Sequence, residues 1–143
     1  QGWFKPLAYA LILLRRDGLP CVFYGDYYGV PHDHIGPVGA QLDTLLRLRR
    51  DAAYGEQIDY FDDYNIVGWT RLGEEDRPGS GCAVILTDGP GGSKNMCMGA
   101  RFAGCTFRDA LGNQKQTIVL DESGSADFCV GGGSVSVWVP DVQ

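Results

Sequence analysis

The chain has 143 residues, of which 44% are hydrophobic and 21% are charged, and its formal net charge is −6 at pH 7. This length fits one domain or two small ones, and the apolar content excludes a disordered chain. An acidic chain gives no reason to expect a nucleic-acid partner. No apolar run approaches the length that spans a bilayer, so we expect no membrane partner either.

The acidic residues are concentrated in the second half of the chain. Residues 1–55 carry six Lys/Arg and five Asp/Glu, whereas residues 56–143 carry six and thirteen. The two halves are therefore different in character, and the acidic half could hold a hard cation such as calcium.

The chain begins Gln-Gly-Trp rather than with Met, and we interpret it as a fragment of a longer protein. Five cysteines cannot all pair with one another, and none has the Cys-x-x-Cys spacing of a zinc ribbon or redox motif. We expect Cys21, Cys82 and Cys97, which lie in apolar runs, to pack as small hydrophobic residues. These features favour a reducing compartment such as the cytoplasm and leave secretion open.

Two helices are predicted in the first half. Over residues 3–16, apolar side chains recur at helical spacing (Trp3, Leu7, Ala10, Leu11 and Leu14), and Gly18 supplies a stop. A second helix is predicted over residues 41–54, with Leu42, Leu45, Leu46, Ala52 and Ala53 inward.

Between these helices, the run Cys21–Tyr24 is bounded by Pro20 and Gly25. Four apolar residues in a row indicate a strand that is buried on both faces, as in a parallel sheet. Residues 1–56 therefore predict the last helix-strand-helix piece of a (β/α)8 barrel. Because that strand lacks neighbours, we expect residues 57–143 to fold better alone than the whole chain does.

The second half, residues 57–143, predicts a C-terminal antiparallel Greek-key β-sandwich, so the fold class is α/β followed by all-β. Ser134–Val139 alternates strictly, which places Val135, Val137 and Val139 on one face. Trp69 and Trp138 lie in β-rich runs, where a core position is favoured over an exposed ligand-binding patch. The predicted strands are Asn65–Arg71, Cys82–Leu86, Met96–Gly99, Thr106–Asp109, Thr117–Leu120, Asp127–Val130 and Ser134–Val139.

Five motifs in order resemble those of the α-amylase family of glycoside hydrolases, liquefying bacterial and fungal type. Gly18-x-Pro20-x-Val22-Phe23-Tyr24-Gly25-Asp26 resembles the segment at the eighth barrel strand of that family. The other four are similar to its C-terminal β-domain: Asp59-Tyr-Phe-Asp62, Asn65-Ile-Val-Gly-Trp-Thr-Arg71, Leu86-Thr-Asp-Gly-Pro-Gly-Gly92 and Gly132-Gly-Ser-Val-Ser-Val-Trp-Val139. The resemblance runs from Trp3 to Val139.

The resemblance implies the C-terminal part of an endo-acting α-amylase, a monomer that hydrolyses internal α-1,4-glucosidic bonds of starch or glycogen with retention. Retention needs two carboxyl groups about 5 Å apart. The family's three catalytic acids precede this segment, so no catalytic residue is assigned and the fragment is expected to be inactive and architectural. Two alternatives stay open: a non-catalytic starch-binding β-domain, and a degraded relative with no role on sugars.

The candidates for contact with the α-glucan follow the predicted strand and are Asp26, Tyr27 and Tyr28, because barrel enzymes bind substrate where strands end. The alternative is an Asp that caps loop amides and tyrosines that pack under the loop. The sequence Pro31-His32-Asp33-His34 could chelate zinc, but a solvated loop is favoured.

A calcium site is the cofactor that the resemblance implies. The corresponding ligands in this chain are the carbonyl of Tyr64, the side chain of Asn65 and the carboxylate of Asp88, within an acidic group that also includes Asp59, Asp62 and Asp63. Relatives carry Asp at the position of Asn65, so one negative charge is missing and binding should be weaker. The alternative is an acidic, solvated face.

Overall fold

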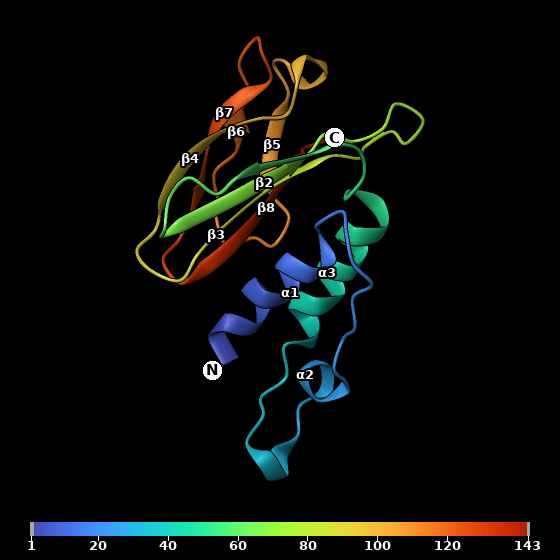
Figure 1. Cartoon of the computed structure of the whole chain (residues 1–143), viewed down its shortest axis with the longest axis vertical. Coiled ribbons are helices and arrows are strands. Elements are labelled where there is room, and N and C mark those ends of the chain that lie inside the picture. The colour runs from blue at the N-terminus through green and yellow to red at the C-terminus, as the bar shows by residue number, and fades with distance from the viewer. Residues whose placement is uncertain (1, 143) are drawn as a thin grey trace.

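The computed structural model describes residues 2–142. Helices occupy the first third of the chain and antiparallel strands the rest. Figure 1 shows α1 and α3 side by side against the larger sheet, with α2 extending away from it. The helical elements are η1 (Gly2–Phe4), α1 (Lys5–Leu13), α2 (Tyr24–Tyr28), η2 (Pro31–Asp33), α3 (Gly39–Asp51) and η3 (Ala100–Phe102).

Both predicted long helices are confirmed, with bounds that differ by a few residues. The first begins as the 3-10 turn η1 and continues as α1, whose first turn accommodates Pro6 because an N–H is not needed there. It ends at Leu13, before Arg15 and Gly18. The second, α3, starts at Gly39 and ends at Asp51. Among the described residues, no helix is both long and apolar enough to cross a membrane.

The predicted strand Cys21–Tyr24 is wrong. Residues 21–23 have no strand pairing, and α2 begins at Tyr24. Phe23 is 56% exposed and Tyr24 71%, and Cys21 is exposed rather than packed. A strand buried on both faces needs hydrogen-bonded neighbours on both edges, and residues 2–142 place none beside this run. The predicted helix-strand-helix unit therefore has its two helices but not the strand between them.

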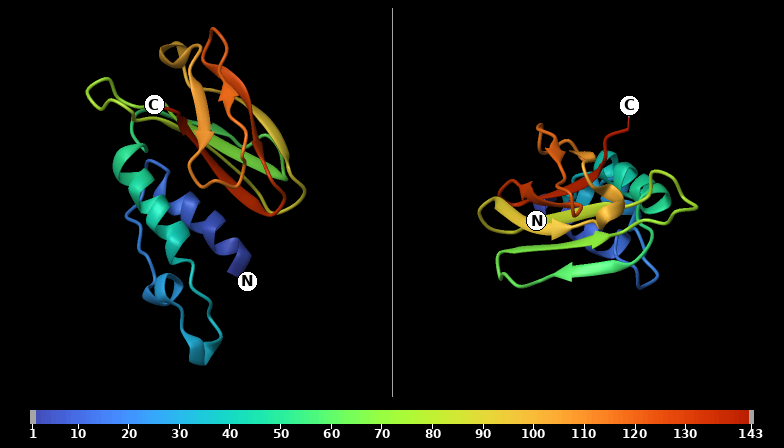
Figure 2. Two further views of the ribbon diagram at one scale, coloured as in Figure 1. Left: turned by 180° about the vertical axis from the view of Figure 1, so that it is seen from behind. Right: turned by 90° about the horizontal axis from the view of Figure 1, so that it is seen from above.

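The two-layer antiparallel arrangement is confirmed. The larger sheet has the order β1-β2-β3-β8-β5-β6, and β4 and β7 form a second sheet; Figure 2 shows the two layers edge-on. Three of the pairs, β3 with β8, β5 with β8 and β4 with β7, join strands that are not consecutive in sequence, as in Greek-key connections. The strands are β1 (Gln57–Tyr60), β2 (Ile66–Arg71), β3 (Cys82–Thr87), β4 (Gly92–Cys97), β5 (Thr106–Asp109), β6 (Ile118–Val119), β7 (Ser125–Val130) and β8 (Ser134–Pro140).

Several predicted strand bounds differ from the structure, and one strand was missed. The run expected at Met96–Gly99 is the end of β4, whose first residues are polar and exposed because the strand lies at an edge. The edge strand β1 was not predicted, since its four residues show no apolar run.

Strand β8 lies between two separate cores. Val135, Val137 and Val139 face the helices, and Trp138 faces the second sheet. Trp69 and Trp138 are both fully buried, which confirms the core assignment for each. The helix-side core joins residues from both halves of the chain, namely Leu7, Tyr9, Ala10, Leu13, Leu14, Leu42, Leu45, Leu48, Ala52 and Ala53 with Trp69, Cys82, Val84, Leu86 and the three valines.

Candidate functional site

Asp26 in α2 is held by two side chains of α1. Its Oδ1 lies 2.6 Å from Lys5 Nζ, and its Oδ2 accepts a hydrogen bond from the Tyr9 hydroxyl at 2.7 Å. The hydrogen bonds from Lys5 and from Tyr9 lower the pKa of Asp26. Tyr9 Oη also accepts from the main-chain N–H of Phe23. Both carboxylate oxygens are thus engaged, and their bonds attach α2 to α1.

Three large rings near Asp26 form an exposed group, here called the α2 aromatic patch: Phe23, Tyr24 and Tyr28. The ring centroids of Tyr24 and Tyr28 lie 4.6 Å apart. Tyr27 contacts Tyr28 edge-on, and its hydroxyl donates to Asp43 Oδ1 at 2.6 Å. The sequence pointed to Tyr27 and Tyr28 but not to Phe23 and Tyr24, because a buried strand would have hidden both of these rings.

The calcium candidates lie in two adjacent turns of the larger sheet. Ile66 pairs with Thr87, so the register sets Asn65 and Asp88 beside each other at the ends of β2 and β3. The Asn65 side chain reaches over Gly89, where Oδ1 would lie 3.5 Å from a Cβ. Tyr64 and Asp88 are exposed. The structure thus brings these positions together.

The neighbouring acidic residues are occupied by protein partners. Arg15 makes a bidentate pair with Asp59, Lys94 pairs with Asp62, and Asp63 accepts from the main-chain N–H of Asn65. Within residues 2–142, no three His, Cys, Asp or Glu side chains are close enough to hold a metal ion. The three candidate positions offer oxygens that suit calcium, but fewer than the six to eight that it takes.

The histidine loop is exposed. His32 lies in η2 and His34 follows it with a left-handed backbone, φ 56°. Both side chains are exposed, which agrees with the prediction of a solvated loop.

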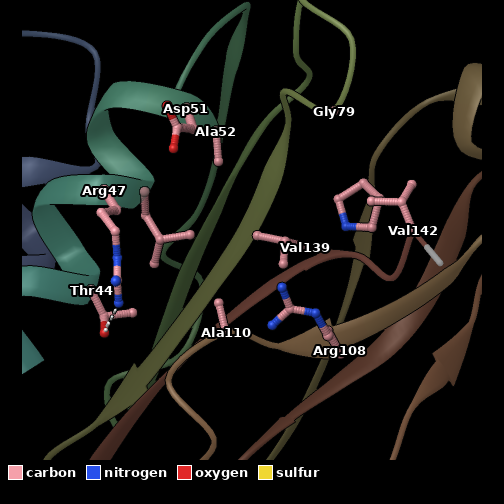
Figure 3. A pocket seen from close by; sticks show the side chains of 11 residues that line it. Thr44, Arg47, Asp51, Ala52, Gly79, Arg108, Ala110, Val139 and Val142 are labelled. Atoms are coloured by element: carbon pink, nitrogen blue, oxygen red, sulfur yellow. Dashed lines mark hydrogen bonds between the residues drawn. The ribbon is translucent and has the colours of Figure 1, made fainter.

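A charged pocket lies where α3 meets the strands. Figure 3 shows Arg47 and Asp51 on α3, and Arg108 and Val139 on the strands opposite. Arg47 donates to Thr44 in its own helix. The sequence carried no signal for this pocket, because its walls come from segments far apart in the chain.

Comparisons with known proteins show what the chain is similar to. The family described as "Alpha-amylase C-terminal" matches residues 83–139. Over 138 residues the chain is 56% identical to an alpha-amylase from Geobacillus stearothermophilus, covering 96% of this chain and 25% of that protein. It is 48% identical over 142 residues to an alpha-amylase from Bacillus licheniformis, covering 97% of this chain and 28% of that one.

Among solved structures, a cyclomaltodextrin glucanotransferase with a three-domain ABC distribution superposes with a TM-score of 0.70 and 19% identity, over 100% of this chain and 33% of that one. This likeness shows the fold, helices included. The chain thus spans about a quarter to a third of the proteins that it matches.

Proposed function

Because the chain carries an alpha-amylase C-terminal domain, we propose that it forms the C-terminal part of an endo-acting α-amylase that hydrolyses internal α-1,4-glucosidic bonds of starch or glycogen with retention. The observation that carries the proposal is 56% identity over 138 residues, which covers the helices as well as the strands. In this proposal residues 1–56 belong to the catalytic barrel domain, and residues 57–143 form the C-terminal β-sandwich.

The role of this segment in catalysis is architectural. Retention requires two carboxyl groups, and the resemblance assigns neither of them to a residue of this chain. Its own residues instead support a neighbouring catalytic domain. The shared core of α1, α3 and the larger sheet makes the helices and the β-domain one packed unit, so a domain attached to the helices is held rigidly to the sandwich.

The outer surface of the helices is suited to contact that domain. The exposed apolar side chains are Phe4 in η1, Ile12 on α1, and Leu19, Phe23 and Tyr24 in the segment that follows. An apolar surface of this kind is typical of an interface. Covering it removes apolar area from water, which stabilises the assembly by about 25 cal/mol per Å².

We propose that Tyr28 of the α2 aromatic patch contacts the glucan, while Asp26 and Tyr27 position it. The exposed Tyr28 ring can stack on a sugar ring. Asp26 is bound by Lys5 and Tyr9, and Tyr27 by Asp43, so these two residues fix α2 between α1 and α3. They are positioning residues in this scheme.

Calcium is the proposed cofactor of the longer enzyme. The Tyr64 carbonyl, Asn65 Oδ1 and the Asp88 carboxylate would supply its ligands from this chain, and the remaining oxygens would come from the catalytic domain. Such an ion would tie the two domains electrostatically. Calcium that raises the Tm of the longer enzyme, with the effect lost in Asp88→Ala, is the expected result; an unchanged Tm would contradict it.

A segment exchange tests the main proposal. The matching 138-residue segment of the G. stearothermophilus alpha-amylase is replaced by this chain, and release of reducing ends from soluble starch is measured. We expect a folded hybrid with activity within about tenfold of the parent, and no activity from the 143-residue chain alone. A hybrid that folds but does not hydrolyse starch would contradict the proposal.

The alternative, a non-catalytic starch-binding β-domain, has less support. Both tryptophans of the sandwich, Trp69 and Trp138, are fully buried and cannot stack on a glucan. A starch pull-down of the 143-residue chain with Trp3 and Tyr28 both replaced by Ala separates the two functions, because only a binding module would be retained through its sandwich.

A further inference from the structure

Trp3 is half exposed, unlike the other two tryptophans. It lies in η1 with 49% of its surface accessible, whereas Trp69 and Trp138 are fully buried. One edge of its ring lies against the backbone of Gly133, where a Cβ would be 3.7 Å from the indole Cε3. Phe4 packs against it edge-on, with ring centroids 5.6 Å apart. The indole is therefore held in place while part of it faces solvent.

The ring forms one wall of a hollow at the seam between the helices and the sandwich. We call this hollow the Trp3 pocket; its walls include Trp3, Gln41, Leu111, Asn113, Ser134 and Val135. Its volume is about 230 Å³, below the range of about 300–1,000 Å³ for sites that enclose a whole drug-sized ligand. A pocket of this size suits one part of a longer molecule.

The polar groups of the pocket are neutral and available. Asn113 Nδ2 donates to the Val135 carbonyl at 2.8 Å, which orients the amide and leaves its Oδ1 as an acceptor. The side chains of Gln41 and Ser134 make no hydrogen bond to other described residues. None of the described lining residues is charged. The pocket of Figure 3, by contrast, has Arg47, Arg108 and Asp51 in its walls.

This combination matches a sugar better than an ion. A pyranose ring has an apolar C–H face, which packs on an indole, and a rim of hydroxyls that both donate and accept. Amide and hydroxyl side chains satisfy such a rim. A charged ligand would lose hydration without gaining a partner of opposite charge.

We propose that the Trp3 pocket binds one or two glucosyl units of an α-glucan, at a surface site separate from the α2 aromatic patch. The choice of an α-glucan over other neutral sugars rests on the proposed function. Trp3 supplies the stacking surface, and Asn113 with Gln41 supplies hydrogen bonds.

The test is a titration of the 143-residue chain with maltotriose, followed by tryptophan fluorescence and by calorimetry. Since Trp69 and Trp138 are buried, a change in emission reports on Trp3. The variants are Trp3→Ala, Trp3→Tyr and Asn113→Ala. Phe61→Ala is the matched control, because Phe61 is 51% exposed and lies outside the pocket. Circular dichroism checks that each variant is folded.

We expect Trp3→Ala to weaken maltotriose binding about fivefold or more, and Trp3→Tyr to retain most of it. Phe61→Ala should stay within about twofold of the parent. Cellotriose, with its different linkage, should bind more weakly than maltotriose. Binding that is unchanged in both Trp3→Ala and Asn113→Ala, or no binding up to the solubility of maltotriose, would overturn the site.

The two proposals fail in distinguishable ways. An active hybrid enzyme, together with a chain that ignores maltotriose, would remove the Trp3 site and leave the α-amylase assignment standing. An inactive but folded hybrid, together with Trp3-dependent binding, would support the site and remove the enzymatic assignment.

Discussion

The indole Nε1 of Trp69 donates a hydrogen bond to the main-chain carbonyl of Leu14, 3.3 Å away, although the two residues are 55 positions apart in sequence. The carbonyl lies at the end of α1, where helix carbonyls lack partners within the helix. Arg71 Nη1 donates to the same oxygen at 3.3 Å. Side chains of β2 therefore cap the C-terminal end of α1, and the β-sandwich stabilises the helical segment directly.

Replacing Arg71 by Ala should lower the free energy of unfolding by about 3 kcal/mol. Arg71 is buried, and its guanidinium donates to the carbonyls of Leu14 and Gly55. Charged hydrogen bonds contribute about 1.5–3 kcal/mol each; the Gly55 carbonyl would lose the donor named here, whereas the Leu14 carbonyl would keep that of Trp69. Urea unfolding measures the change. Arg101→Ala is the control, because Arg101 is exposed and donates only to the Leu72 carbonyl; equal effects in both variants would contradict the argument.

Removing the helices should destabilise the sandwich. The sequence alone suggests that residues 57–143 fold better than the whole chain, but the shared core argues for the opposite. Without residues 1–56, the larger sheet exposes a face that includes Trp69, Val84 and Val137, all fully buried in the whole chain. We expect the truncated protein to bind a hydrophobic dye and to associate in light scattering. A monomeric truncated protein with a higher Tm than the whole chain would refute this.

The bonds to Asp26 should make stability depend on pH on the acid side. Lys5 and Tyr9 hold the pKa of Asp26 in the folded chain below its ordinary value of 3.8. The ionised Asp26 therefore contributes its full stabilisation above about pH 4, which is the pKa of an Asp in the unfolded chain. This stabilisation is lost as the pH falls through the lower pKa of Asp26 in the folded chain.

The comparison of parent and Asp26→Asn isolates this contribution. From pH 6 to pH 3, the free energy of unfolding should fall more for the parent than for the variant. Tyr9→Phe, which removes one of the two donors to the carboxylate, should lie between them. Parallel pH profiles for all three proteins would rule the mechanism out.

The cysteines should differ widely in reactivity. Burial raises the pKa of the fully buried Cys82 to about 12, while Cys21 is exposed. Since the thiolate is the reactive form, iodoacetamide at about pH 8 should label Cys21 first and Cys82 only when the chain unfolds. Peptide mass spectrometry follows each site, and Cys21→Ser should remove the fastest phase. Early labelling of Cys82 would show that the helix-side core opens locally.

The sequence by itself determined those elements whose signal is local. The leucine spacing in residues 3–16 and 41–54 predicted α1 and α3, and the alternation in Ser134–Val139 predicted which side chains of β8 share a face. Trp69 and Trp138 were correctly assigned to the core for the same reason. Periodicity of side chains records which face of an element is buried, whatever covers it.

Only the tertiary structure decided the features that depend on distant partners. The run Cys21–Tyr24 is apolar enough for a strand, but a strand exists only where another strand satisfies its backbone, and within residues 2–142 none lies beside it. The join between Leu14 and Trp69, the seam at Trp3 and the adjacency of Asn65 and Asp88 likewise come from register and packing. These contacts form between segments far apart in the chain, and no local pattern encodes them.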